Sequence, residues 1–142
     1  TTVVLDDYGK AILLANQTFT AASKDATAKR MIFTSIDWPT VEPEVDVQPA
    51  AQASANLGIR IDAIAFGDFD TDGDTVINTG VGLRAQRALQ MMATLTGGRY
   101  YPAPSLSDLL QAFGSIASSV ATAQVCSRNY VNTWPRAGLY VR

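Results

Sequence analysis

Residues 58–67 read Gly-Ile-Arg-Ile-Asp-Ala-Ile-Ala-Phe-Gly, and this stretch decides the fold. Its nearly continuous apolar run between two glycines is typical of a strand buried in the middle of a parallel sheet. Two further strand-like segments, residues 31–36 and 99–103, lie on either side of it in the sequence, separated by stretches long enough for helices. Short β-rich runs that alternate with helical patterns indicate βαβ units. The sequence therefore predicts the α/β class, as a doubly wound parallel sheet with helices on both faces.

Four segments have the apolar spacing of helices, and the end of the chain does not. We predict helices near residues 6–19, 49–57, 81–95 and 106–122. Ser105 and Asp108 form a capping box at the start of the last one. The later residues are aromatic and β-branched, with Pro135 and Gly138 among them. We therefore predict a domain over residues 1–124 and an extended, aromatic, β-like tail over residues 125–142.

The composition is that of one globular domain. The chain has 142 residues, of which 47% are apolar, and this proportion permits a core and argues against disorder. No apolar run approaches the roughly 18 residues that a membrane-spanning helix needs. The chain begins with Thr-Thr-Val-Val instead of Met and shows no signal peptide, which we interpret as a processed or partial chain.

Missing residue types exclude several kinds of chemistry. The chain has no His and a single cysteine, Cys126. Most zinc sites, Ser-His-Asp triads, Cys-His dyads and any internal disulfide are therefore excluded. A bound metal would have to be a hard cation held by oxygen atoms. Cys126 is interpreted either as a buried thiol or as a link to another chain.

The acidic residues are concentrated in one part of the chain. Nine of the thirteen acids lie between Asp37 and Asp74, where Arg60 is the only base. Such a local field favours cations and disfavours nucleic acid. Two interpretations stay open, namely a solvated acidic surface and a cation site.

Residues 68–78 have the spacing of a calcium-binding loop. Counted from Asp70, carboxylates occupy alternate positions of the loop, as they do in an EF-hand. Thr75 stands where that loop has Gly, and Val81 stands where it has a bidentate acid. The alternative is an Asp-Gly-rich turn with solvated carboxylates. The candidate Ca²⁺ ligands are Asp68, Asp70, Asp72, Asp74 and Asn78.

Three segments together resemble the carboxyl-terminal half of a von Willebrand factor A-type domain. The first is the strand that ends in Asp at residues 31–37, and the second is the strand at residues 58–68. The third is Met-Ala-Thr-Leu-Thr-Gly-Gly-Arg-Tyr-Tyr-Pro-Ala at residues 92–103, followed by a helix with apolar residues from Leu109 to Ile116. The resemblance covers about residues 5–122. It implies a doubly wound parallel sheet and, for many members, Mg²⁺, Ca²⁺ or Mn²⁺ at an adhesion site.

The resemblance also implies where a remnant of that metal site would lie. The family's Asp after the fourth strand corresponds to Asp37, and its Thr in a second loop corresponds to Thr1 or Thr2, whereas its Asp-x-Ser-x-Ser loop is absent from this chain. These ligands are too few for a closed six-coordinate site. We therefore expect Asp37 to be metal-free in this chain alone. We also expect a protein partner or another copy to complete the sheet, because proteins usually cover open sheet edges. A degenerate member that packs as a scaffold is the other interpretation.

These inferences favour a non-catalytic binding or adhesion module of an extracellular or surface-appendage protein, such as a pilus component, dependent on Ca²⁺ or Mg²⁺. The alternative is a structural subunit that forms oligomers through its open sheet edge and its aromatic tail. A metal-assisted hydrolase is less favoured, because the chain has no Gly-rich phosphate loop, no nucleophile motif and no His. We expect neither a nucleic-acid partner nor a membrane span.

Overall fold

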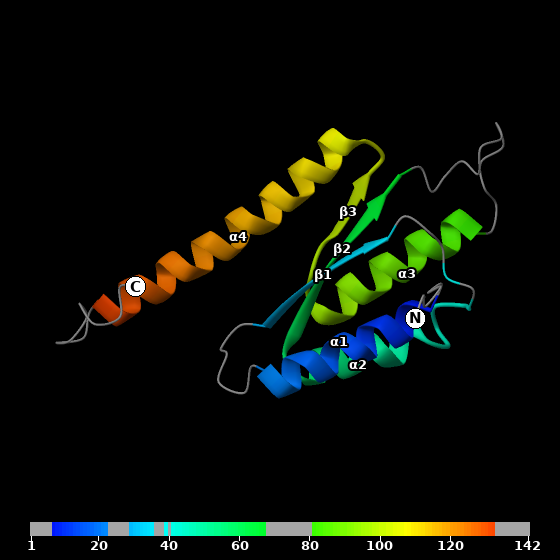
Figure 1. Ribbon diagram of the computed structural model, residues 1–142, viewed down its shortest axis with the longest axis horizontal. Helices are drawn as coiled ribbons and strands as arrows, with labels where there is room; N and C mark the ends of the chain where they lie inside the picture. Colours follow the sequence, from blue (N-terminus) through cyan, green and yellow to red (C-terminus); the bar gives the residue numbers. More distant parts are fainter. Residues whose placement is uncertain (1–6, 23–28, 36–38, 40, 68–80, 133–142) are drawn as a thin grey trace. The chain divides into compact units, whose positions relative to one another are not determined.

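A three-stranded parallel sheet holds the stretch at residues 58–67 in its centre (Figure 1). The computed structural model describes residues 7–22, 29–35, 39, 41–67 and 81–132. The strands are β1 (Lys29–Ser35), β2 (Ile59–Phe66) and β3 (Tyr100–Ala103), in the order β1-β2-β3. Both pairings are parallel, with Arg30 opposite Arg60 and Ile64 opposite Tyr101. The predicted α/β class, with a parallel sheet flanked by helices, is confirmed.

In the described residues, four helices alternate with these strands. They are α1 (Tyr8–Ala22), α2 (Val47–Asn56), α3 (Val81–Thr96) and α4 (Leu106–Asn132). α2 begins two residues before its predicted start, because the Asp46 side chain accepts the Val47 amide at 2.7 Å and caps the helix there. The predicted capping box of α4 is confirmed. The Asp108 amide donates to Ser105 Oγ at 3.2 Å, and the Ser105 amide donates to Asp108 Oδ2 at 3.1 Å.

The core lies between one face of the sheet and α1, α2 and α3, which Figure 1 shows together on one side. Alternate residues of β2 contribute to it, because successive side chains of a strand point to opposite faces. The buried core residues include Tyr8, Ile12, Val47, Ala50, Ala51, Ile59, Ile61, Ala63, Leu89 and Met92. Asp62 and Ile64 belong to the other face of β2 and are also fully buried. Burial on both faces is what a central parallel strand requires.

The Thr-Gly-Gly turn between α3 and β3 shows why its sequence is so specific. Thr96 Oγ1 donates to the Met92 carbonyl at 2.7 Å and accepts the Ile61 amide at 2.8 Å. One side chain therefore bonds a carbonyl in the last turn of α3 and a backbone amide of β2. Gly97 has a φ of 73°, a conformation that side chains disfavour. A Cβ atom on Gly98 would overlap the Ile61 carbonyl group. The turn therefore packs directly on the backbone of β2.

The predicted extended tail is wrong over residues 125–132, where α4 continues to Asn132. That segment contains neither Pro nor Gly, and the next helix breaker is Pro135. Once a helix has formed, each further residue adds a backbone hydrogen bond without a new nucleation cost. Residues 133–142, the rest of the predicted tail, lie outside the described residues.

The chain divides into two compact units between Leu109 and Leu110. The sheet and the first three helices belong to the first unit, and most of α4 belongs to the second, which is described by itself. The predicted domain boundary after residue 124 stays a prediction. No helix among the described residues combines the length and the apolar character that crossing a bilayer needs.

Candidate functional site

The carboxyl end of the sheet carries the start of α1. The Tyr8 hydroxyl donates to Ser35 Oγ at 2.7 Å, and Ser35 is the last residue of β1. The Tyr8 ring also packs against Phe33, with ring centroids 5.1 Å apart. Parallel sheets place ligand groups at this end of their strands. The start of α1 is therefore held at the carboxyl end of the strands, where this architecture binds ligands.

The start of α2 lies directly beside the start of α1. Each helix begins with an aspartate that accepts backbone amides. Asp7 Oδ1 accepts the Lys10 amide at 2.9 Å, and Asp46 Oδ2 accepts the Gly9 amide at 3.3 Å. A Cβ atom on Gly9 would lie 2.6 Å from the Asp46 carbonyl oxygen. Glycine at position 9 is thus what lets the two first turns touch, and the contact brings Asp7 and Asp46 to one place.

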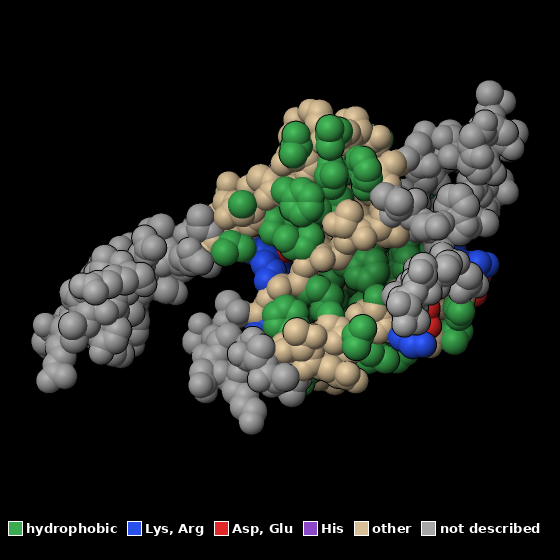
Figure 2. All heavy atoms as spheres, viewed as in Figure 1, with side chains coloured by type: hydrophobic (Ala, Val, Ile, Leu, Met, Phe, Trp, Pro, Cys, Tyr) green, Lys and Arg blue, Asp and Glu red, His purple; other side chains and the backbone are tan. Residues whose placement is uncertain are grey.

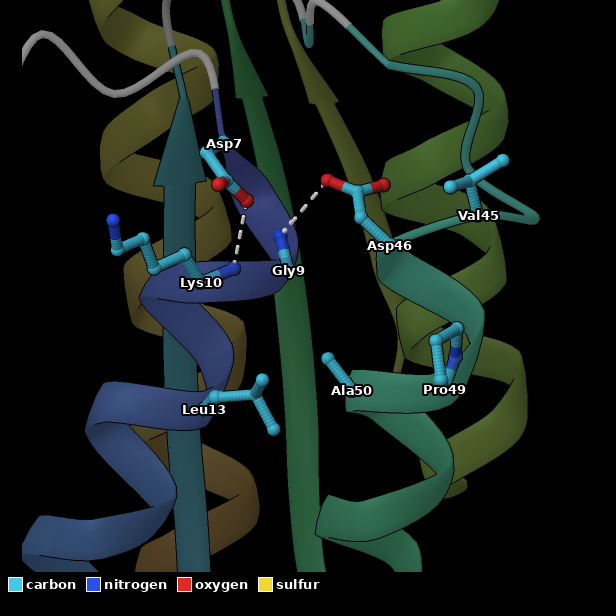
Figure 3. A pocket seen from close by; sticks show the side chains of 8 residues that line it. All are labelled: Asp7, Gly9, Lys10, Leu13, Val45, Asp46, Pro49 and Ala50. Atoms are coloured by element: carbon cyan, nitrogen blue, oxygen red, sulfur yellow. Dashed lines mark hydrogen bonds between the residues drawn. The ribbon is translucent and has the colours of Figure 1, made fainter.

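A pocket of about 350 Å³ opens between these two helix starts (Figure 3). Leu13 and Ala50 point into the space between the helices, while the carboxylates of Asp7 and Asp46 lie at one end of it. The eight lining residues are Asp7, Gly9, Lys10, Leu13, Val45, Asp46, Pro49 and Ala50. None of these eight carries a hydroxyl, thiol or imidazole that could act as a nucleophile. Their charged groups are two carboxylates and the ammonium group of Lys10, so the lining has a net negative charge.

The Asp46 carboxyl is partly buried in this pocket and lies near a second carboxylate, Asp7. Burial raises the pKa of Asp46 above its ordinary value, and the negative charge of Asp7 acts in the same direction. The hydrogen bonds from the amides of Gly9 and Val47 favour the charged form and offset part of the rise in pKa. A cation in the pocket would lower the pKa of Asp46, because an opposite charge favours the ionised carboxylate.

The site residues predicted from the sequence lie outside the described residues. These are Asp37 and Thr2, proposed as remnants of an adhesion metal site, and Asp68, Asp70, Asp72, Asp74 and Asn78, proposed as a calcium loop. The described residues next to them in sequence are Ser35, at the end of β1, and Gly67, directly after β2. Among the described residues, no three Asp, Glu or Cys side chains gather into a group that could hold a metal.

Asp62 is a buried carboxylate inside the apolar run of β2. Its side chain is 0% exposed. Asp62 Oδ2 accepts Arg30 Nε at 2.5 Å, and Asp62 Oδ1 accepts the Arg99 amide at 2.9 Å. A carboxylate inside an otherwise apolar run is a recognisable signal, because a buried charge needs a partner. Its partners come from β1 and from the residue before β3, so the sequence alone does not name them.

An exposed ion-pair network ties the segment before α2 to α3. Glu42 pairs with Arg84 at 2.6 Å and with Arg87 at 2.7 Å, and Glu44 pairs with Arg87 at 3.0 Å. The hydrogen bond from Arg87, followed by that from Arg84, lowers the pKa of Glu42 below its ordinary value. The same network raises the pKa of Arg87. On the face drawn in Figure 2, Lys and Arg side chains form small separate groups instead of a continuous basic surface.

Comparison with solved structures identifies proteins of the same fold. The conserved hypothetical protein BatB from Bacteroides thetaiotaomicron superposes with a TM-score of 0.57 at 18% identity, over 80% of this chain and 58% of BatB. An aerotolerance-related membrane protein from Bacteroides fragilis, with multiple mutations to serines, has a TM-score of 0.50 at 20% identity, over 72% of this chain and 54% of that protein. No family model matches the chain. No curated protein matches it either. The likeness concerns the fold alone, and the chain spans little more than half the length of these two structures.

Proposed function

We propose that this chain is part of a von Willebrand factor A-type module that binds a protein partner without catalysis, in an extracellular or surface-appendage protein. The observation that carries the proposal is the open edge of the sheet at β1. Among the described residues, β2 has a strand on each side, whereas β1 and β3 each have only β2 as a neighbour, and β1 is the longer of these two edge strands. The fold shared with BatB over 80% of this chain supports the A-type assignment. A further strand beside β1, from a partner or another copy, would complete the sheet.

A divalent cation at the carboxyl end of the sheet is the second part of the proposal. Ca²⁺ or Mg²⁺ would be held by oxygen atoms of the acidic residues that follow β1 and β2. The support from the described residues is electrostatic. Asp7 and Asp46 already place two carboxylates at this end of the strands, and burial, with the charge of Asp7, raises the pKa of Asp46. Their field would raise the local concentration of cations.

The test of the cation is calorimetric titration of the full chain with CaCl₂ and with MgCl₂, together with thermal unfolding. Saturable Ca²⁺ binding should raise the free energy of unfolding by about 1.4 kcal/mol at a tenfold excess over Kd. Asp72→Ala should abolish this rise if the loop after β2 is the site, and Asp37→Ala should abolish it if the site follows β1. Glu44→Gln is the control, because Glu44 is exposed and paired with Arg87. The absence of binding at millimolar Ca²⁺ and Mg²⁺ would contradict the cation part.

Assembly through β1 is the second candidate function, and the exposure of Ile32 on one face of this strand favours it. Ile32 is 44% exposed, although it lies in the middle of a parallel strand. In a structural subunit, another copy would cover β1, and the aromatic residues near the end of the chain would contribute. Light scattering after size-exclusion chromatography separates the cases. Oligomers that Ile32→Lys dissociates would support assembly, whereas a stable monomer at high concentration would contradict it.

A further inference from the structure

Two arginines stand side by side at the amino end of the sheet, far along the strands from the carboxyl edge. Arg30 of β1 and Arg60 of β2 are partners in the parallel register, so their side chains leave the same face. Like charges directly opposite each other on a sheet destabilise it. Asp62 lies two residues after Arg60 on that face, where its negative charge separates the two guanidinium groups. The three side chains carry two positive charges and one negative charge.

The single carboxylate is already occupied by other donors. Asp62 Oδ2 accepts Arg30 Nε, and Asp62 Oδ1 accepts the Arg99 amide at 2.9 Å. Arg60 Nε lies 3.5 Å from Asp62 Oδ1, which satisfies an ion-pair distance but exceeds the roughly 3.2 Å limit of a good N–H···O bond. Arg60 Nε is shielded from water and has no hydrogen-bond acceptor among the described residues. A buried donor left in this state costs free energy.

The other described carboxylates are engaged elsewhere. Asp7, Asp46 and Asp108 accept amides at the starts of helices, and Glu42 and Glu44 pair with arginines of α3. Within the described part of the chain, the carboxylate that lies within ion-pair distance of Arg60 is thus that of Asp62. The Arg60 side chain is 36% exposed, so part of it is accessible from outside although its Nε atom is buried. Ile32, the register partner of Asp62, is on the same face and 44% exposed.

We propose that Arg60 binds a carboxylate supplied by an acidic side chain of a protein partner, which also places an apolar group on Ile32. A guanidinium group presents several N–H donors in a planar fork that matches a carboxylate. Asp62 acts as the positioning group for the two arginines. It leaves N–H donors of Arg60 without a hydrogen bond to Asp62, and these donors would bind the partner's carboxylate. The excess positive charge repels cationic partners and attracts acidic ones. The site lies at the opposite end of the strands from the proposed cation, so neither requires the other.

The experiment follows the Nε–Hε signals of arginine by ¹H–¹⁵N NMR in the full chain. The probes are sodium acetate and the capped dipeptide acetyl-Leu-Glu-amide, each compared with NaCl at equal ionic strength. Both probes should shift the Arg60 signal in a saturable way, and the dipeptide should bind about threefold tighter, because its leucine covers part of Ile32. Ile32→Ala should remove that advantage and leave acetate unchanged.

Substitutions of arginine separate specific binding from general ionic effects. Arg60→Lys keeps the charge but loses the fork, so acetate binding should weaken, and Arg60→Gln should abolish it. Binding to these two variants is followed by the backbone amide signals of Ile32 and Asp62, because the Arg60 Nε–Hε signal is lost with the arginine side chain. Arg87→Gln is the matched control, because Arg87 is exposed and already paired with Glu42 and Glu44. Should Arg60→Gln fail to fold, Arg60→Lys and the wild-type titration still decide the question. A shift that does not saturate, or that NaCl reproduces, overturns the site. Acetate that binds as tightly as the dipeptide overturns the protein source of the carboxylate.

Discussion

β1 and β2 are parallel neighbours, but they differ in composition and in burial, since three of the seven β1 residues are apolar against six of the eight in β2. β2 has six of its eight residues buried, including side chains on both faces, whereas β1 has only Met31 buried among seven residues. β2 pairs with a strand on each side, and α2 and α3 cover one of its faces. Among the described residues, β1 pairs on one side only. The more apolar strand thus occupies the central position, and the more polar strand lies at the edge of the sheet.

The difference indicates that the central strand contributes most to the stability of the fold, whereas the edge strand is available to bind another chain. A buried central strand contributes apolar area and satisfied backbone groups. An edge strand offers N–H and C=O groups to another chain. The two arginines and Asp62 join these regions, because Arg30 comes from β1 and the buried carboxylate comes from β2. Both proposed protein contacts lie on or beside β1.

The largest expected effect contrasts an isoleucine in each strand. Ile61→Ala should lower the free energy of unfolding by about 3–4 kcal/mol, because Ile61 is fully buried in the core. Ile32→Ala should cost less than about 1 kcal/mol, since Ile32 is 44% exposed. Urea unfolding followed by circular dichroism measures both values. Equal costs would show that another element covers β1 in solution.

The next effect tests how closely the Thr-Gly-Gly turn packs on β2. Gly98→Ala should destabilise the fold by about 3 kcal/mol, because the new Cβ meets the Ile61 carbonyl and neither backbone can move freely. Gly114→Ala is the control. It lies in α4 with open space around its Cβ position, and Ala should stabilise a helix there by up to about 1 kcal/mol. A neutral Gly98→Ala would contradict the close contact.

A smaller effect tests the link between the strands. Asp62→Asn keeps the size of the side chain but removes its charge, and we expect a loss of about 2 kcal/mol, because Arg30 and the Arg99 amide lose an ionised acceptor. Glu42→Gln removes a carboxylate from an exposed network and should cost much less. Thermal unfolding at low and high salt compares them. Only the Glu42 effect should fade in high salt, because buried pairs are screened less.

The smallest effect is a pH dependence of opposite sign at two acids. The pKa of Asp46 is raised in the folded chain, so its contribution to stability is present below the unfolded pKa of about 3.9 and is lost as pH rises through the folded value. Asp46→Asn keeps a good helix cap and should gain stability relative to wild type as pH rises, by well under about 1 kcal/mol for so partly buried a group.

Glu42 should behave in the opposite way. Its pKa is lowered by Arg87 and Arg84, so its contribution is present above the unfolded pKa and is lost as pH falls through the folded value. Glu42→Gln should therefore lose stability relative to wild type as pH rises. Urea midpoints between about pH 3 and 6 cover both transitions. Parallel trends in the two variants would contradict the assigned causes of the shifts.

Much of the fold could be predicted from the sequence, because the patterns involved are local. The alternation of apolar runs and helical spacing predicted three parallel strands and four helices, and the structure confirms each of these elements. The capping box at Ser105 was predictable, since it needs only residues three positions apart. The far end of α4 was not, because aromatic and β-branched residues favour strands only when a neighbouring strand is present.

The candidate site could be predicted less well, because its contacts join distant residues. The acidic residues after β1 and β2 were recognised by spacing alone, and their grouping stays a prediction. The proximity of Asp7 and Asp46 could not be predicted from the sequence. It depends on the contact between Gly9 and Asp46, which are 37 positions apart. The partners of Asp62 could not be predicted either, because Arg30 is 32 positions away in the sequence and Arg99 is 37 positions away.

The sequence by itself determined the class of the fold, the order of its elements and the excess of acid that favours a cation. These follow from periodicity, chain-breaking residues and composition, which act over a few neighbouring positions. Only the tertiary structure decided the register of the strands, the approach of Asp7 to Asp46, and the lack of a hydrogen-bond acceptor for Arg60 Nε among the described residues. Those outcomes are set by the packing of the whole core.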